Sequence, residues 1–178
     1  MSVYSQIRDA LFDGSDALIK RTEYTPQIIF SHGNGLEPTN DYIVINILGL
    51  EQTGRVYNSS LTDGVVGPTG LKSHFQSFHE ARVQFSFYGS NSGDIADVFH
   101  RYINNYTMTR DDWCRFGLAP NRKTQVVYNP QLRDTQWVDA FNFTVTFAYG
   151  VHESKEVDWV EHVTINTNGR SSTIPPVA

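Results

Sequence analysis

Apolar residues recur at helical spacing in two segments of the chain. In residues 94–106 they follow one another at steps of three and one, which is the pattern of one helix face. Residues 4–19 carry a similar apolar stripe with polar residues on the other side. A third, short helix is expected over residues 109–115, because Thr109 and Asp112 have the spacing of a capping box and a glycine follows as a stop signal.

Alternating or continuous apolar runs predict the strands. Residues 42–50 are nearly all large or β-branched, as in a central strand. Residues 141–149 alternate strictly between apolar and polar, and residues 157–165 alternate again after a charged tract. These two runs predict an antiparallel β-hairpin with a protruding tip at residues 151–158. Further strands are expected at residues 27–30, 75–88 and 124–128.

Other stretches lack such periodicity. Residues 54–70 are rich in Gly, Ser, Thr and Asn, so we expect a long loop that contacts other proteins. Residues 168–178 have no pattern, and we expect them to form a flexible or partner-bound tail after a single domain over residues 1–167. Residues 89–93 predict a turn from a strand into a helix, with hydroxyl groups capping that helix.

The order of the predicted elements favours one α+β domain. The chain has 178 residues, which is the usual size of a single domain. Strands outnumber helices and successive strands can pair, so we expect an antiparallel or mixed β-sheet with two to three helices packed on one face. The long loop and the protruding β-hairpin complete this expected fold.

The charge of the chain argues against tight binding of nucleic acid. Its formal net charge is −5 and its 14 basic residues are scattered, whereas nucleic-acid-binding proteins cluster Lys and Arg against the phosphates. The single cysteine, Cys114, excludes an intramolecular disulfide and is expected to face the core. No export signal and no apolar run of about 20 residues is apparent, so we expect a protein of the reducing cytosol with no membrane partner.

No arrangement typical of a catalytic or cofactor site stands out. The six histidines lack metal-ligand spacing with one another or with carboxylates. The segment 89–93 resembles a nucleophile elbow, but Asn91 stands where the nucleophilic serine would be needed. Asp111 and Asp112 are expected to stabilise a helix N-terminus. We therefore expect no catalytic residues, no cofactor and no metal, and we do not expect an enzyme.

Several blocks of sequence form a recognisable set. A strand that ends in Tyr88 and Gly89 precedes a helix, and a closing strand has the pattern D-W-V-E-H-V-T-I over residues 158–165. They are accompanied by the opening helix with Ile7, Ala10 and Leu11, the strand at residues 42–46, Gly117 with Leu118, and the strand at residues 141–147. Together these blocks resemble the phage neck terminator, or tail terminator, family of long-tailed bacteriophages.

The resemblance implies a structural virion protein of the tail and neck. It implies a tail terminator that forms a homo-hexameric ring, caps the tail tube and joins it to the head-side neck connector. The implied partners are other copies of the chain, the tail tube protein and the neck or head-completion connector proteins, with the tail sheath as a further candidate. DNA would pass through the ring without specific binding, which suits an acidic protein, and assembly would take place in the host bacterial cytoplasm.

Alternative functions stay open at this point. A tail-tube or head-completion (connector) protein would share the structural role but assemble differently. A small ligand- or peptide-binding α+β module would instead be a stable monomer with a pocket. A hydrolase without a recognisable motif is a third alternative.

The contacts of a ring are expected on the long loop and the hairpin tip. Both segments are long and polar and lack core patterning, which suits edge pairing or side-chain docking. The residues expected to make these contacts are Arg55, Tyr57, Asp63, Val65, Val66, His152, Glu153, Lys155 and Glu156.

Overall fold

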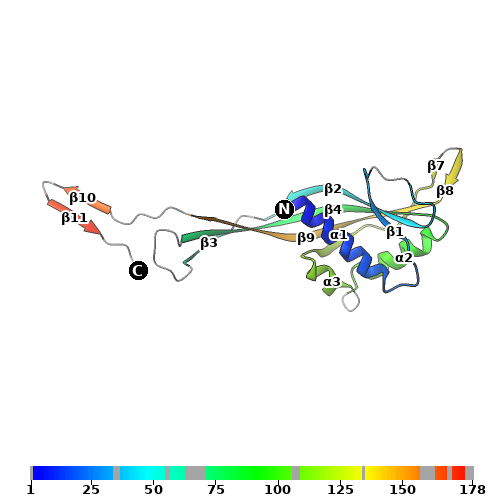
Figure 1. Cartoon of the computed structure of the whole chain (residues 1–178), viewed down its shortest axis with the longest axis horizontal. Helices are drawn as coiled ribbons and strands as arrows, with labels where there is room; N and C mark the ends of the chain where they lie inside the picture. The colour runs from blue at the N-terminus through cyan, green and yellow to red at the C-terminus, as the bar shows by residue number, and fades with distance from the viewer. Residues whose placement is uncertain are drawn as a thin grey trace. The chain divides into compact units, whose positions relative to one another are not determined.

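In a computed structural model, the chain folds into two compact units. Unit 1 comprises Met1–Gly54 and Phe78–Gly150, and unit 2 comprises Arg55–Ser77 and Val151–Ala178. Figure 1 traces the chain through both. The structure describes residues 2–33, 37–54, 57–62, 71–105, 109–133, 135–156, 163–167 and 170–174.

The main sheet is mixed, as the sequence predicts. Its strands follow the order β1-β2-β4-β9-β5, with β3 paired to β4 and β6 paired to β9. Strand β1 is parallel to β2, whereas β2 with β4, and β5 and β6 with β9, are antiparallel. The strands are β1 (Gln27–Phe30), β2 (Tyr42–Gln52), β3 (Tyr57–Thr62), β4 (Leu71–Tyr88), β5 (Ala119–Lys123), β6 (Val127–Tyr128) and β9 (Ala140–Glu156).

Three helices lie on one face of this sheet in unit 1 (Figure 1). They are α1 (Val3–Ile19), α2 (Ser92–Ile103) and α3 (Arg110–Arg115), and α1 contacts both of the others. All three helices were expected from the sequence, and the α+β class with helices on one face is confirmed. Their apolar stripes provide the surface that packs against the sheet.

The core lies between the helices and the sheet. Phe85 of β4 packs against Phe99 of α2 and Phe143 and Phe147 of β9, with ring centroids 5.0, 5.7 and 6.4 Å apart. Trp113 of α3 is fully buried, with its ring 4.9 Å from that of Phe147. The alternation predicted for these strands thus reflects one buried face, because successive side chains of a strand point to opposite sides.

A smaller cluster lies on the opposite face of the sheet. Tyr42 and Tyr88 are cross-strand neighbours whose rings stack 4.9 Å apart, and they pack with Ala140 and Val138. The hydroxyl of Tyr42 donates to the carboxylate of Glu37. Burial, with a smaller contribution from Tyr88, raises the pKa of Tyr42 to about 12. The phenol therefore keeps its proton, and its donation to Glu37, to a higher pH than an ordinary tyrosine would.

The turn into α2 has the predicted position but is held by a different contact. The carboxylate of Asp41 accepts hydrogen bonds from the backbone N and the Nδ2 of Asn91, the N-cap residue of α2, at 3.1 and 2.7 Å. Gly89 has a φ of +111°, and an added Cβ would lie 2.2 Å from Asp41 Oδ1, so only glycine fits there. The N-cap residue makes no side-chain hydrogen bond to the helix, so the expectation of hydroxyl caps is wrong. The turn is instead held by a residue 50 positions away in the chain.

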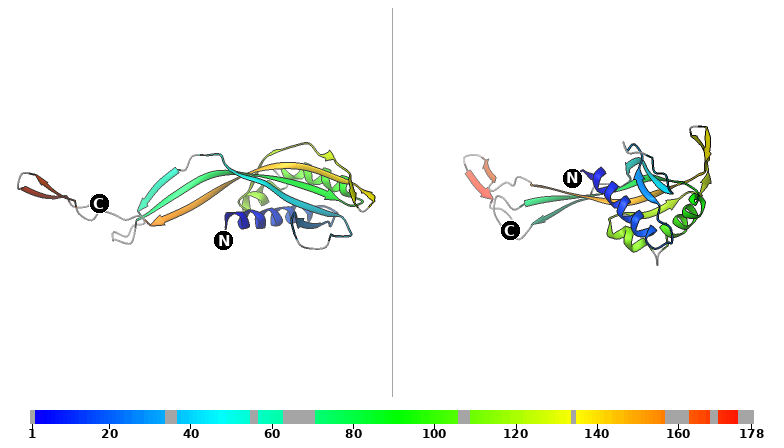
Figure 2. Two further views of the ribbon diagram at one scale, coloured as in Figure 1. Left: turned by 90° about the horizontal axis from the view of Figure 1, so that it is seen from above. Right: turned by 45° about the vertical axis from the view of Figure 1, so that its right-hand side comes forward.

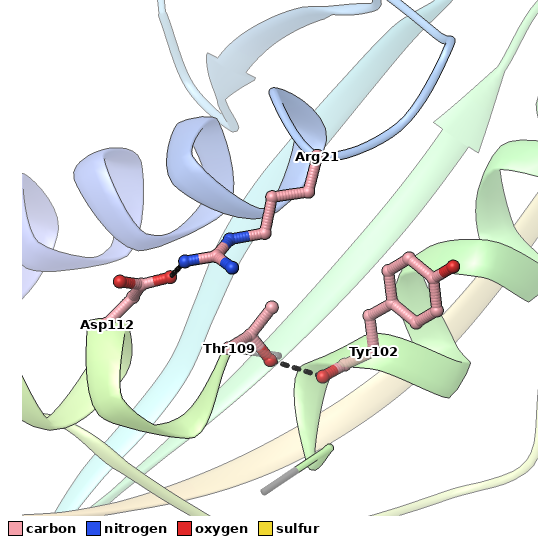
Figure 3. Close-up of polar contacts among 4 residues, drawn as sticks. All are labelled: Arg21, Tyr102, Thr109 and Asp112. Carbon is pink, nitrogen blue, oxygen red and sulfur yellow. Dashed lines mark hydrogen bonds and ion pairs between the residues drawn. The ribbon is translucent and has the colours of Figure 1, made fainter. Parts of the chain in front are cut away.

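Helix α3 is held by side-chain contacts to α2 and to the end of α1 (Figure 3). The Thr109 hydroxyl donates to the carbonyl of Tyr102, and Asp112 forms an ion pair with Arg21. The predicted capping box between Thr109 and Asp112 is thus wrong, because both side chains bind partners outside the helix. Cys114 is exposed and does not face the core, contrary to expectation.

The hydroxyl of Thr109 gives a first test of this packing. Thr109 is buried, and Thr109→Val keeps the volume of the side chain while removing the donor to the Tyr102 carbonyl. We expect the free energy of unfolding to fall by about 1 kcal/mol, the usual net value of a hydrogen bond. Urea denaturation measures it. Thr53→Val, at an exposed position with only a 3.4 Å bond to the Phe78 carbonyl, is the control and should change little.

Unit 2 consists of paired strands. Strand β3 is antiparallel to the first part of β4, from Tyr57 opposite Gln76 to Thr62 opposite Leu71. Strand β10 (Val163–Thr167) is antiparallel to β11 (Arg170–Ile174). The expected loop over residues 54–70 therefore contains a strand. Its sequence, YNSSLT, shows no apolar alternation by which the strand could have been predicted.

Other strand predictions also need correction. Residues 151–156, expected at a hairpin tip, continue β9. Of the strand expected over residues 157–165 to pair with residues 141–149, the described part, residues 163–165, belongs to β10 and pairs with β11, whereas residues 157–162 lie outside the described residues. The strand expected at residues 124–128 is strand only at its end, and β5 before it was missed. The predicted boundary between a domain over residues 1–167 and a tail stays a prediction.

Candidate assembly interface

The predicted interface residues that the structure describes all belong to unit 2. Tyr57 lies in β3, opposite Gln76 of β4. His152 and Glu153 are exposed on β9, and the strand continues through Lys155 and Glu156. These residues are therefore presented on strands, not on a loop and a hairpin tip as expected. The other predicted positions lie outside the described residues: Arg55, Asp63, Val65 and Val66.

Unit 1 has an exposed apolar hairpin that the sequence analysis missed. Strands β7 (Gln131–Arg133) and β8 (Gln136–Val138) form a two-stranded sheet in which Leu132 is directly opposite Trp137. Both side chains are exposed, Leu132 by 60% and Trp137 by 71%. The strands are only three residues long, too short for periodicity to reveal them. The presence of a tryptophan, Trp137, in this short segment was the one feature of the sequence that could have indicated a contact surface.

The base of this hairpin is fixed to the smaller cluster described above. Gln131 Nε2 donates to the hydroxyl of Tyr88 at 3.2 Å, and Val138 packs against the cluster. Figure 2 shows the hairpin projecting from the sheet. Leu132 and Trp137 are thus held on an anchored element while their side chains face solvent.

A groove of about 730 Å³ lies between α1 and β1, on the helix-covered face. Its apolar lining includes Phe12, which is 42% exposed, and Phe30. The Arg8 guanidinium carbon lies 4.6 Å from the centre of the Phe30 ring, within reach of a cation–π contact. Asp9 and Asp13 add carboxylates from α1. The groove can therefore accept an apolar side chain that also carries a hydrogen-bond donor.

A second hollow, of about 510 Å³, is polar. Its lining includes Glu80, Arg82 and Arg122, and Arg122 lies 3.6 Å from the Glu80 carboxylate. Lys123 donates to the carbonyl of His100 at 2.5 Å, and burial lowers the pKa of its amine. Arg122, Glu80 and Lys123 thus pair with protein groups, and none of the interactions described for the lining places a nucleophile beside a base.

In the described part of the chain, no group of three or more His, Cys, Asp or Glu side chains is placed to hold a metal ion. Within the same residues, no helix is long and apolar enough to cross a membrane.

Comparison with known proteins identifies a family for the chain. A family model described as phage neck terminator protein matches residues 1–171. No curated protein matches the chain. The family match covers both units and all but the last seven residues of the sequence.

Proposed function

Because the chain belongs to the phage neck terminator family, we propose that it forms a hexameric ring that caps the finished tail tube and joins it to the head-side neck connector. Membership itself makes the chain a structural component of the virion tail and neck and implies a non-enzymatic role. The single observation that carries the proposal is the family match over residues 1–171.

Ring formation places a geometric demand on each copy of the chain. A closed ring with more than two members requires a heterologous interface, in which two different surfaces of each copy meet. The tail tube protein, the connector proteins and the tail sheath are the further partners in this proposal. The net charge of −5 supports a lumen through which DNA passes without specific binding, after assembly in the host bacterial cytoplasm.

The decisive experiment measures the native mass of the purified protein, alone and with tail tubes, followed by negative-stain imaging. A hexamer with a central hole, formed alone or at tube ends, is the expected result. Long tubes of the protein alone would instead support a tail-tube protein. A monomer that stays monomeric with tail tubes would contradict the ring and support a binding module.

We further propose that the predicted residues of unit 2 make contacts between subunits or with the tube: Arg55, Tyr57, Asp63, Val65, Val66, His152, Glu153, Lys155 and Glu156. The exposure of His152 and Glu153 on a strand supports this, because exposed strand residues can dock against a neighbouring chain.

Reversing one charge tests this surface. Glu153→Lys should weaken the assembly about tenfold or more, because like charges brought together at an interface are costly. The change in assembly is obtained from the concentration at which half of the protein is assembled, measured by native mass. Glu23→Lys, at an exposed position of unit 1, is the matched control. Equal assembly by both variants would remove Glu153 from the interface.

A further inference from the structure

The exposed β7–β8 hairpin of unit 1 lacks a partner for its apolar pair within the described residues. Tryptophan is among the residues most enriched at the energetic centres of protein interfaces, and here Trp137 stands beside Leu132 on one face of the hairpin. A two-stranded hairpin alone is only marginally stable in water. Contact with another protein would bury the side chains of Leu132 and Trp137 and would also stabilise the hairpin.

The α1–β1 groove has the matching chemistry. Phe12 and Phe30 offer apolar surface, and Arg8 already lies over an aromatic ring there. Asp9 and Asp13 offer carboxylate acceptors, whereas the indole of tryptophan has one N–H donor and no acceptor. A tryptophan and a leucine presented side by side could therefore fill the groove and satisfy the indole N–H.

The two surfaces lie on opposite faces of the same sheet. Gln131, at the base of the hairpin, bonds to Tyr88, whose side chain points away from the helices because its neighbour Phe87 points into the helix-side core. The groove, in contrast, is lined by α1 on the helix-covered face (Figure 1). The hairpin base and the α1 side of the groove therefore lie on different faces of the sheet.

We propose that Leu132 and Trp137 of one copy dock into the α1–β1 groove of a second copy. Two different surfaces then meet, which is the heterologous contact that a closed ring requires. This inference rests on the proposed ring function, and it assigns one contact of that ring to named residues of unit 1.

The first test removes the apolar pair. Trp137→Ala combined with Leu132→Ala should weaken the contact between copies about 30-fold or more, as expected for an interface hot spot. Val127→Ala, at a 53% exposed position of β6, is the matched control and should assemble like the wild type. Native mass, with and without tail tubes, measures assembly, and an unchanged melting temperature checks that the variant is folded.

The second test locates the contact directly. In a Cys114→Ser background, Gln136→Cys protein, which keeps Leu132 and Trp137, is mixed with Ser5→Cys protein and treated with a short bismaleimide. Cross-linked dimers should form in the mixture and far less in either variant alone. Glu23→Cys, which lies outside the groove lining, replaces Ser5→Cys as the control and should give few cross-links.

The outcomes separate this inference from the proposed function. A wild-type ring with unchanged assembly of the double alanine variant and no specific cross-link would overturn the hairpin contact and leave the ring intact. A variant that forms rings but no longer binds tail tubes would also overturn it, because the hairpin would then serve the tube. A wild-type protein that never forms a ring would overturn both proposals.

Discussion

Replacing Phe85 by alanine is expected to lower the free energy of unfolding by about 4 kcal/mol, the usual range for a large aromatic side chain lost from a core. Phe85 is fully buried at the centre of an aromatic group that includes Phe99, Phe143 and Phe147. The substitution leaves a cavity and also removes three ring–ring contacts. Such a loss is a large fraction of the stability of a typical domain.

Urea denaturation of the whole protein, followed by tryptophan fluorescence, measures this effect on unit 1. Trp113 suits the purpose because it is fully buried 4.9 Å from Phe147. Phe78→Ala makes the same chemical change at a 48% exposed position and should cost far less. Similar losses for the two variants would show that the aromatic group is not the centre of the core.

Replacing Gly14 by alanine should lower the free energy of unfolding by about 2 kcal/mol. A Cβ on Gly14 would lie 2.3 Å from Cζ3 of Trp113, and that indole is fully buried. Overpacking of this kind typically costs about 1 to 3 kcal/mol. The clash should outweigh the gain of about 1 kcal/mol that alanine brings over glycine inside a helix.

A double-mutant cycle isolates the clash. Trp113→Phe removes the ring atoms that the new Cβ would meet, so Gly14→Ala should cost much less in that background. Gly49→Ala is the control, because nothing lies within 4 Å of its added Cβ. A cost of Gly14→Ala that is the same in both backgrounds would contradict the proposed contact with Trp113.

Prediction from sequence succeeded where one face of an element is buried. The helices expected at residues 4–19 and 94–106 correspond to α1 (Val3–Ile19) and α2 (Ser92–Ile103), each of which has buried residues along one side. The inward faces of β4 and β9 also show their alternation. In each case the core imposes a period on the sequence, and the period can be read without knowledge of the partner.

Prediction failed for strands that are recognised by their pairing with another strand and not by an apolar pattern. Strand β3 is mostly polar and pairs with residues of β4, while β7 and β8 are three residues each. The interface residues predicted from loop length remain a proposal. The hairpin pair Leu132 and Trp137 was missed, because exposure of an apolar side chain depends on what the rest of the chain covers.

The sequence by itself determined the family, the α+β class and the elements with a buried face, because periodicity and family blocks are properties of the residue order. Only the tertiary structure decided the close approach of Gly14 to Trp113, the hydrogen bonds between Asp41 and the N-cap residue of α2, and the placement of the hairpin base and the α1 side of the groove on different faces of the sheet. Each of these depends on contacts between residues far apart in the chain, and such contacts leave no period in the sequence.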